Sequence, residues 1–262
     1  GMGFVDLPFA IENVRCENPE AAAHTRIGWF RSVSNVPHAF AIQSMVAEIA
    51  HELGRDPKDM LLELIGPARI VDLGKSVKDL WNYGEPFDSY PIDAGRLRRV
   101  TELAAEKAEW GRKLPARHGL GIAAHRSFVS YIATVVEVAV DEQGAISIPR
   151  VETAVDCGTY VNPERIRSQM EGAAIMGLSL AKHGAITFKN GRAQQSNFDD
   201  YPVARIDESP TITNTWIVPG ENRPPSGIGE PGVPPFAPAL CNAIFAATGK
   251  RVRSLPIGQQ LV

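Results

Sequence analysis

The sequence predicts an α+β fold, in which two-layer subdomains pack mixed or antiparallel sheets against helices. Two observations lead to this class: helical apolar periodicity dominates the first part of the chain, and β-branched runs with hairpin-type turns follow it. At about 150 residues per domain, the 262 residues fit one large domain or two small ones. We therefore divide the chain into a helical part, residues 1–118, and a second α+β part, residues 119–262.

The first half of the sequence predicts three helices. In each of them apolar side chains recur at three- and four-residue steps, which is the pattern of one buried helical face. The first helix follows Pro37 and ends at Gly54, the second begins near Asp56-Pro57, and the third spans roughly residues 94–111. Residues 72–92 are expected to form a loop. The exposed face of the third helix is expected to carry a solvated charged stripe, made of Arg96, Arg99, Glu102 and Glu106.

The second half predicts strands joined by short turns, with two further helices. The apolar run 131–140 suits a covered strand, and residues 141–144 are a turn into a second strand at 145–155. Asn162-Pro163-Glu164 is typical of a helix start, and that helix is expected to end near Lys182. The remaining elements are a hairpin around Asn190-Gly191, a strand at 211–218 and a helix at 238–248.

The composition is that of a globular chain without a polyanionic partner. Hydrophobic residues make up 44% of it, which is enough for a sizeable core. Lys and Arg total 27 against 30 Asp and Glu, so nothing favours nucleic acid as a ligand. No apolar run reaches the ~18 residues of a membrane span. Cys16, Cys157 and Cys241 are far apart, which predicts no iron–sulfur or zinc motif and favours a reducing, cytoplasmic compartment.

The most unusual segment is residues 224–235, PPSGIGEPGVPP. Its spacing Gly227-x-Gly229-x-x-Gly232 matches a dinucleotide-binding fingerprint, but the prolines that follow interrupt the helix which that fold requires. Two interpretations stay open on the residues alone. Either a rigid loop brings backbone N–H groups to a ligand and holds Glu230 as a general base, or this is a proline-rich connection with a solvated Glu230.

Two other places are candidates for binding. Gly172 and Gly177 lie inside the predicted helix 163–182, where each costs about 1 kcal/mol relative to Ala, so a close neighbour is expected at both. Arg31 precedes the first helix, where its donors and the helix N-terminus suit an anion, although an ordinary capping loop would look the same.

Four stretches of the chain together resemble one family. They are GWFRSVSNVPHAF, GLGIAAHRSFVSYIATVVEV, VDCGTYVNPERIRSQMEGAAIMG and PPSGIGEPGVPPFAPALCNAIFAATGK. In this order they are similar to the C-terminal part of the molybdopterin-binding large subunit of molybdenum hydroxylases, the xanthine dehydrogenase and aldehyde oxidase superfamily. The order is most similar to that of the isoquinoline 1-oxidoreductase β subunit.

The resemblance implies a role for each matched position. Glu230 corresponds to the catalytic base that takes a proton from molybdenum-bound hydroxide or water, while an N-heterocycle or aldehyde is oxidised with water as the oxygen source. The residues implied to bind the cofactor are Ser226, Gly227, Ile228 and Gly229 by their backbone, Arg31 and Ser32 beside the metal and substrate, and Gln169 and Gly172 on a nearby helix. No residue of this chain is implied as a metal ligand.

The resemblance also implies what this chain lacks. The cofactor would be molybdenum–molybdopterin in its cytosine dinucleotide form, shared with an upstream half of the large subunit. A small [2Fe–2S] subunit would carry electrons away, and the substrate would be a small molecule. The chain alone is then expected neither to bind cofactor tightly nor to turn over, and export to the periplasm would depend on a partner. The alternative is a non-catalytic remnant or interaction module.

Overall fold

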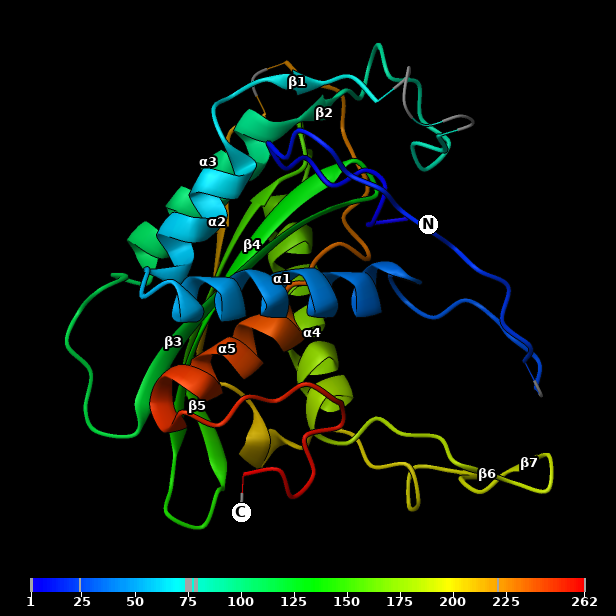
Figure 1. Ribbon diagram of the computed structural model, residues 1–262, viewed down its shortest axis with the longest axis vertical. Helices are drawn as coiled ribbons and strands as arrows, with labels where there is room; N and C mark the ends of the chain where they lie inside the picture. The colour runs from blue at the N-terminus through cyan, green and yellow to red at the C-terminus, as the bar shows by residue number, and fades with distance from the viewer. Residues whose placement is uncertain (1, 24, 74–76, 78–79, 221, 262) are drawn as a thin grey trace.

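The computed structural model describes residues 2–23, 25–73, 77, 80–220 and 222–261. A four-stranded mixed sheet forms its centre, and helices from both halves of the chain pack on it (Figure 1). The elements in chain order are α1 (Asn35–Glu52), α2 (Pro57–Ile65), β1 (Ile70–Val71), β2 (Ile92–Asp93), α3 (Ala94–Lys107), β3 (His118–Ser127), β4 (Ser130–Val140), β5 (Ile146–Asp156), α4 (Pro163–Lys182), β6 (Phe188–Lys189), β7 (Arg192–Ala193), η1 (Ile206–Glu208), β8 (Ile212–Ile217) and α5 (Phe236–Thr248).

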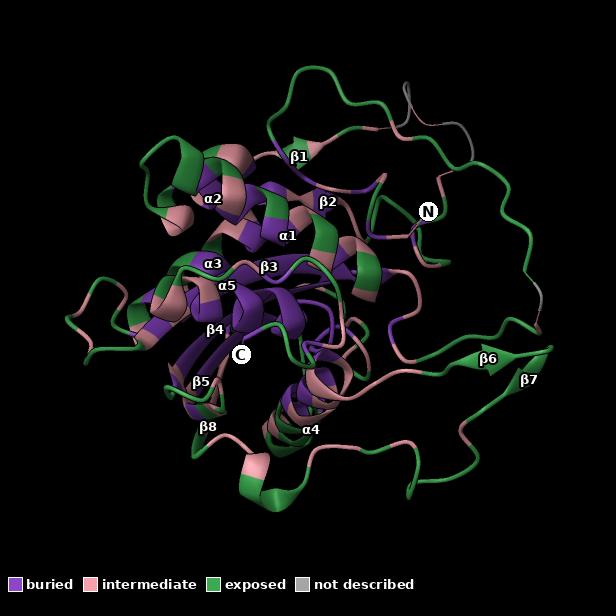
Figure 2. Ribbon diagram, turned by 60° about the horizontal axis from the view of Figure 1, so that its bottom comes forward, coloured by how far each residue is buried: buried purple, intermediate pink, exposed green. Residues whose placement is uncertain are grey.

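The central sheet has the strand order β3-β4-β5-β8, with antiparallel pairs except for β8, which runs parallel to β5. Because α4 lies between β5 and β8 in the chain, it supplies the crossover that a parallel pair needs. One face of the sheet packs against α3, and the other against α5 with α4 beside it. The sheet and α5 are buried at the centre of the molecule (Figure 2). The α+β class with a mixed sheet is confirmed.

Local signals place the starts of α2 and α4 and the end of α5 where the sequence predicts them, whereas α3 ends at Lys107, before the predicted residue 111. The Asp56 side chain accepts from the first N–H groups of α2, and Asn162 does the same for α4. Gly249 closes α5 in the left-handed conformation, with φ of 73°. The short hairpin β6–β7 turns at Asn190 and Gly191 as expected, although its strands are only two residues long.

Three details differ from the sequence-based expectations. Arg96 is only 8% exposed, because it pairs with Asp156 beneath α3 instead of facing solvent. Helix α1 begins before Pro37, and part of its predicted apolar face is exposed: Met45, Ile49 and Leu53. The predicted loop 72–92 falls partly on residues 74–76 and 78–79, which lie outside the described residues, and its last residue begins β2.

Strand β3 is absent from the elements predicted, and its composition explains why. It contains Gly119 and Gly121 in place of β-branched residues. The α5 backbone lies directly on these two glycines, since a Cβ on Gly121 would be 2.1 Å from the Ala239 oxygen. Glycine therefore serves here for close helix–strand contact. The division at residue 118 stays a prediction, although core residues from both sides of it pack in one cluster.

Candidate functional site

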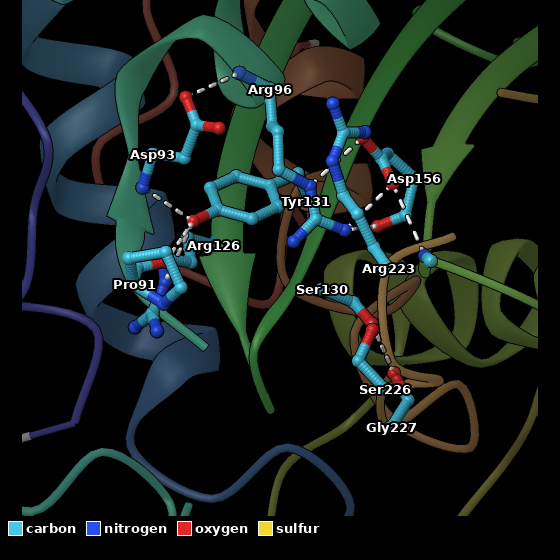
Figure 3. Close-up of polar contacts among 11 residues, drawn as sticks. Pro91, Asp93, Arg96, Arg126, Ser130, Tyr131, Asp156, Arg223, Ser226 and Gly227 are labelled. Atoms are coloured by element: carbon cyan, nitrogen blue, oxygen red, sulfur yellow. Dashed lines mark hydrogen bonds and ion pairs between the residues drawn. The ribbon is translucent and has the colours of Figure 1, made fainter. Parts of the chain in front are cut away.

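The loop that carries Glu230 is held between the ends of three central strands. The Ser226 N–H donates to the Cys157 oxygen just after β5 (2.9 Å), and the Gly227 N–H donates to the Phe128 oxygen in the β3–β4 turn (3.1 Å). The hydroxyl of Ser130, the first residue of β4, donates to the Gly227 oxygen at 2.6 Å (Figure 3). Because this bond uses the only proton of the Ser130 hydroxyl, the Ser226 hydroxyl donates in the 2.6 Å contact between the two serines. These bonds join the loop to the most buried part of the fold.

The segment before α1 contacts Glu230 at two points. The Ser32 N–H donates to Glu230 Oε1 at 2.9 Å, and the Ser32 hydroxyl donates to the Glu230 backbone oxygen at 2.6 Å. Ser32 and Val33 have φ of 74° and 50°, a left-handed conformation that costs about 1–3 kcal/mol for each non-glycine residue. No described residue bonds to Glu230 Oε2, so this oxygen of the half-buried carboxylate is available to a ligand.

Arg31 lies across the same site, beside the carboxylate. Its Nε donates to the Gly229 oxygen at 2.7 Å, and its Nη2 donates to Gln169 Oε1 on α4 at 2.9 Å. Partial burial lowers the pKa of Arg31, and the nearby Glu230 charge opposes that shift. Within the described residues the two side chains form no direct ion pair, so the guanidinium contributes charge without occupying the carboxylate.

Four glycines around the site fall into two kinds. A Cβ on Gly177 would meet the Phe236 side chain at 2.7 Å, and one on Gly227 would meet Phe128 at 2.9 Å, so these two glycines serve packing. A Cβ on Gly172 or on Gly229 would have no other described atom within 4 Å. The close protein neighbour that we expect at both helical glycines therefore exists at Gly177 only. Gly172 lies one turn from Gln169, on the face of α4 that Arg31 contacts.

The loop also offers backbone donors. The N–H groups of Ser226 and Gly227 are used inside the protein, whereas those of Ile228, Gly229 and Glu230 donate to no acceptor in the described part of the chain. Three consecutive N–H groups beside an arginine fit a ligand that is rich in oxygen acceptors or carries negative charge. The described residues contain no group of three or more His, Cys, Asp or Glu side chains that could hold a metal ion.

A buried polar cluster behind Ser32 was not predicted. Arg126 pairs with Asp6 at 2.8 Å, and both are less than a tenth exposed. His125 is 2% exposed, and its Nε2 lies 3.0 Å from Asn35 Oδ1. The signal in the sequence was a His-Arg pair within a strand that is otherwise apolar, because such residues are buried only when they have partners.

The buried His125 predicts a loss of stability in mild acid. Burial lowers its pKa to about 4; Asp6 opposes this shift, and His38 and Arg126 reinforce it. An unfolded histidine takes up its proton near pH 6.5, at about its ordinary pKa. Between these values the unfolded state binds more protons than the folded state, so stability falls as the pH falls. We expect a loss of about 3 kcal/mol across this window, measured by urea unfolding at each pH.

His125→Gln is the control for this prediction. Glutamine retains an N–H donor for Asn35 but does not titrate, so this part of the pH dependence should disappear while any contribution from carboxylates stays. An unchanged pH profile in the variant would rule out His125 as its source.

Comparison with known proteins identifies the family. A sequence profile for the molybdopterin cofactor-binding domain matches residues 75–210, just over half of the chain. The chain belongs to this family. Over 257 residues this chain is 30% identical to a nicotinate dehydrogenase subunit of Pseudomonas putida, a match that covers 97% of the chain and 21% of that relative. It is 29% identical to the beta subunit of isoquinoline 1-oxidoreductase of Brevundimonas diminuta, covering 98% of the chain and 29% of that protein.

Solved structures show the same fold. The aldehyde oxidoreductase of Desulfovibrio gigas superposes with a TM-score of 0.65, at 14% identity, over 88% of this chain and 41% of that one. This chain spans only about a fifth to three tenths of the length of the curated relatives named above. No helix in the described ranges is both long and apolar enough to cross a membrane.

Proposed function

We propose that this chain forms part of the catalytic subunit of a molybdenum hydroxylase, in which Glu230 is the general base for oxidation of an N-heterocycle or an aldehyde. The observation that carries the proposal is the Glu230 carboxylate. One of its oxygens accepts the Ser32 N–H, and the other faces no described partner, beside Arg31 and the unpaired N–H groups of the loop. This is the arrangement of a positioned proton acceptor.

The donors at the site fit a molybdopterin cofactor. Arg31, the Gln169 amide and the N–H groups of residues 228–230 would hold its oxygen-rich organic part, and Gly172 and Gly229 leave room for it. When bound, the molybdenum–molybdopterin cofactor supplies the oxidising chemistry that no side chain of this protein provides. The cytosine dinucleotide form is part of the proposal. It rests on the resemblance to relatives of the isoquinoline 1-oxidoreductase type.

The residues of the chain then have distinct tasks. Glu230 accepts the proton from the water that supplies oxygen to the substrate, and Oε2 is the atom that takes it. Ser32 keeps the carboxylate oriented through Oε1. Arg31 fixes the loop through the Gly229 oxygen and adds a positive charge that favours anionic groups of the ligand.

We propose that the complete enzyme contains protein segments besides the residues of this chain. Because the chain spans only part of its relatives' length, we propose an upstream half of the molybdopterin-binding subunit and a small [2Fe–2S] subunit as partners, with a small molecule as substrate. The segment next to Arg31 supports a protein partner there. Ile27 (84% exposed), Trp29 (89%) and Phe30 (50%) expose apolar side chains within four residues of one another, and contiguous exposed apolar surface is typical of interaction sites.

Co-expression with the neighbouring genes tests the proposal. We expect a complex that contains this chain and carries molybdenum, measured by elemental analysis after size-exclusion chromatography, and that oxidises an N-heterocycle or aldehyde with an artificial electron acceptor. The chain expressed alone is the control and should contain little of the metal. Absence of both a co-purifying polypeptide and molybdenum under every combination would favour the non-catalytic alternative.

A further inference from the structure

We propose that Asn35 is a positioning residue for Glu230, which it reaches through Ser32. The inference rests on the proposed role of Glu230 as a base. It concerns a contact inside this chain, however, so it can be tested without the cofactor.

The first step is the contact between Asn35 and Ser32. The Asn35 side chain donates from Nδ2 to the Ser32 oxygen at 3.0 Å, and its backbone N–H donates to the same oxygen at 3.0 Å. The N–H of Ser32 donates to Glu230 Oε1. Both bonds depend on the left-handed conformation of Ser32, which a non-glycine residue adopts only when its surroundings hold it there. Asn35 thus holds the Ser32–Val33 peptide, and through the fixed left-handed conformation of Ser32 it sets the direction of the N–H that Glu230 accepts.

The side chain of Asn35 is itself oriented by two buried residues. Its Oδ1 accepts from the Tyr83 hydroxyl at 3.0 Å and lies 3.0 Å from His125 Nε2. Burial raises the pKa of Tyr83, so its hydroxyl keeps its proton, and burial lowers the pKa of His125, so its ring is neutral. The Ser32 carbonyl oxygen can only accept, so Nδ2 is the Asn35 atom that faces it and Oδ1 faces Tyr83 and His125. The neutral His125 ring then carries its proton on Nε2. Asn35 is fully buried, so this orientation is not exchanged for contacts with water.

A purely structural role for Asn35 would be the ordinary alternative, because Asn35 opens α1. The residue before it, Ser34, makes no side-chain cap bond to the helix, and the Asn35 amide is directed away from the first turn toward Ser32. The side chain therefore contributes to the conformation of the loop in front of the helix. A test must follow Ser32 itself rather than the overall stability.

The amide proton of Ser32 is the readout, measured by NMR on the isotope-labelled 262-residue chain. A bond to an ionised carboxylate shifts such a proton downfield, and Glu230→Gln should move it upfield because a neutral amide is a weaker acceptor. We expect Asn35→Ala to move the same signal in the same direction and to speed its exchange with solvent. Tyr83→Phe removes one donor to Asn35 at nearly constant volume and should give a smaller shift of the same sign.

Gln43→Ala is the matched control. Gln43 is also a buried amide on α1, and it bonds to Ala124 of β3 through both its nitrogen and its oxygen. Its loss should cost comparable stability but leave the Ser32 amide unchanged. If Gln43→Ala moves the Ser32 signal as far as Asn35→Ala does, the effect is general loosening and the inference is wrong.

The remaining outcomes separate this inference from the proposed function. A Ser32 signal that responds to Glu230→Gln but to neither Asn35→Ala nor Tyr83→Phe overturns the role of Asn35 and leaves the Glu230 contact intact. Tyr83→Phe keeps the test valid if Asn35→Ala does not fold. A signal that follows all three variants, in a chain that never acquires molybdenum with any partner, supports the positioning network and refutes the catalytic proposal.

Discussion

Glu230→Gln is expected to lower the turnover of the assembled molybdenum enzyme by at least about 10²-fold, the contribution of a positioned general base. Glutamine retains the size of the side chain and an oxygen that accepts the Ser32 N–H, so the loop should keep its structure. It does not accept a proton at neutral pH, which is the task proposed for Oε2. The measurement is the steady-state rate with an artificial electron acceptor, normalised to the molybdenum content.

Glu142→Gln is the control, because it makes the same chemical change at an exposed carboxylate in the β4–β5 turn. It should leave both the rate and the metal content unchanged. A Glu230→Gln enzyme with normal metal content and an undiminished rate would show that Glu230 is not the base.

Asp156→Asn is expected to destabilise the chain by about 3–5 kcal/mol, because it leaves the Arg96 charge buried without its partner. The ion pair measures 2.6 Å, and its side chains are 8% and 1% exposed (Figure 3). Burial acts to lower the pKa of Arg96, and Asp156 raises it. Because a guanidinium keeps its proton at neutral pH even without that partner, the variant leaves a charge buried. Urea unfolding at neutral pH measures the loss.

Glu63→Gln is the matched control, because it removes the carboxylate charge from the exposed pair Arg55–Glu63. Exposed pairs contribute about 0–1 kcal/mol. If Asp156→Asn costs no more than Glu63→Gln, the buried pair does not stabilise this fold.

Asp156→Asn should also affect the candidate site. Asp156 ends β5 and accepts the Gly158 N–H at 3.2 Å, and Cys157 between them holds the Ser226 N–H. The ion pair beneath α3 therefore supports the end of β5 that anchors the Glu230 loop. Ser226 and Gly227 should lose protection from hydrogen exchange in Asp156→Asn before the helices do.

The helices and most strands could be predicted because their signals are local. Asp56-Pro57 and Asn162-Pro163 mark helix starts through contacts with the next few residues, and the β-branched run of β4 suits a covered strand whatever lies on it. Strand β3 could not be predicted in this way. Its Gly119 and Gly121 are explained by the α5 backbone, which lies more than a hundred residues away in the sequence.

The candidate site could likewise be predicted only in part. Residue types and spacing pointed to Glu230 and Arg31 as separate candidates, and the family resemblance assigned them, together with Gln169, to one site. Their contacts join residues that are 138 and 198 positions apart, and no local pattern indicates which Glu230 oxygen Ser32 occupies. The support from Asn35 and His125 was missed for the same reason.

Short-range sequence patterns thus establish the α+β class, the helix ends and the loop that presents Glu230, since capping, periodicity and turn conformation depend on neighbouring residues. The long-range packing establishes that Arg96 is buried, that Ser32 is held in a left-handed conformation and that one carboxylate oxygen stays available. Burial and charge pairing depend on the residues that the fold brings together, and these come from distant parts of the chain.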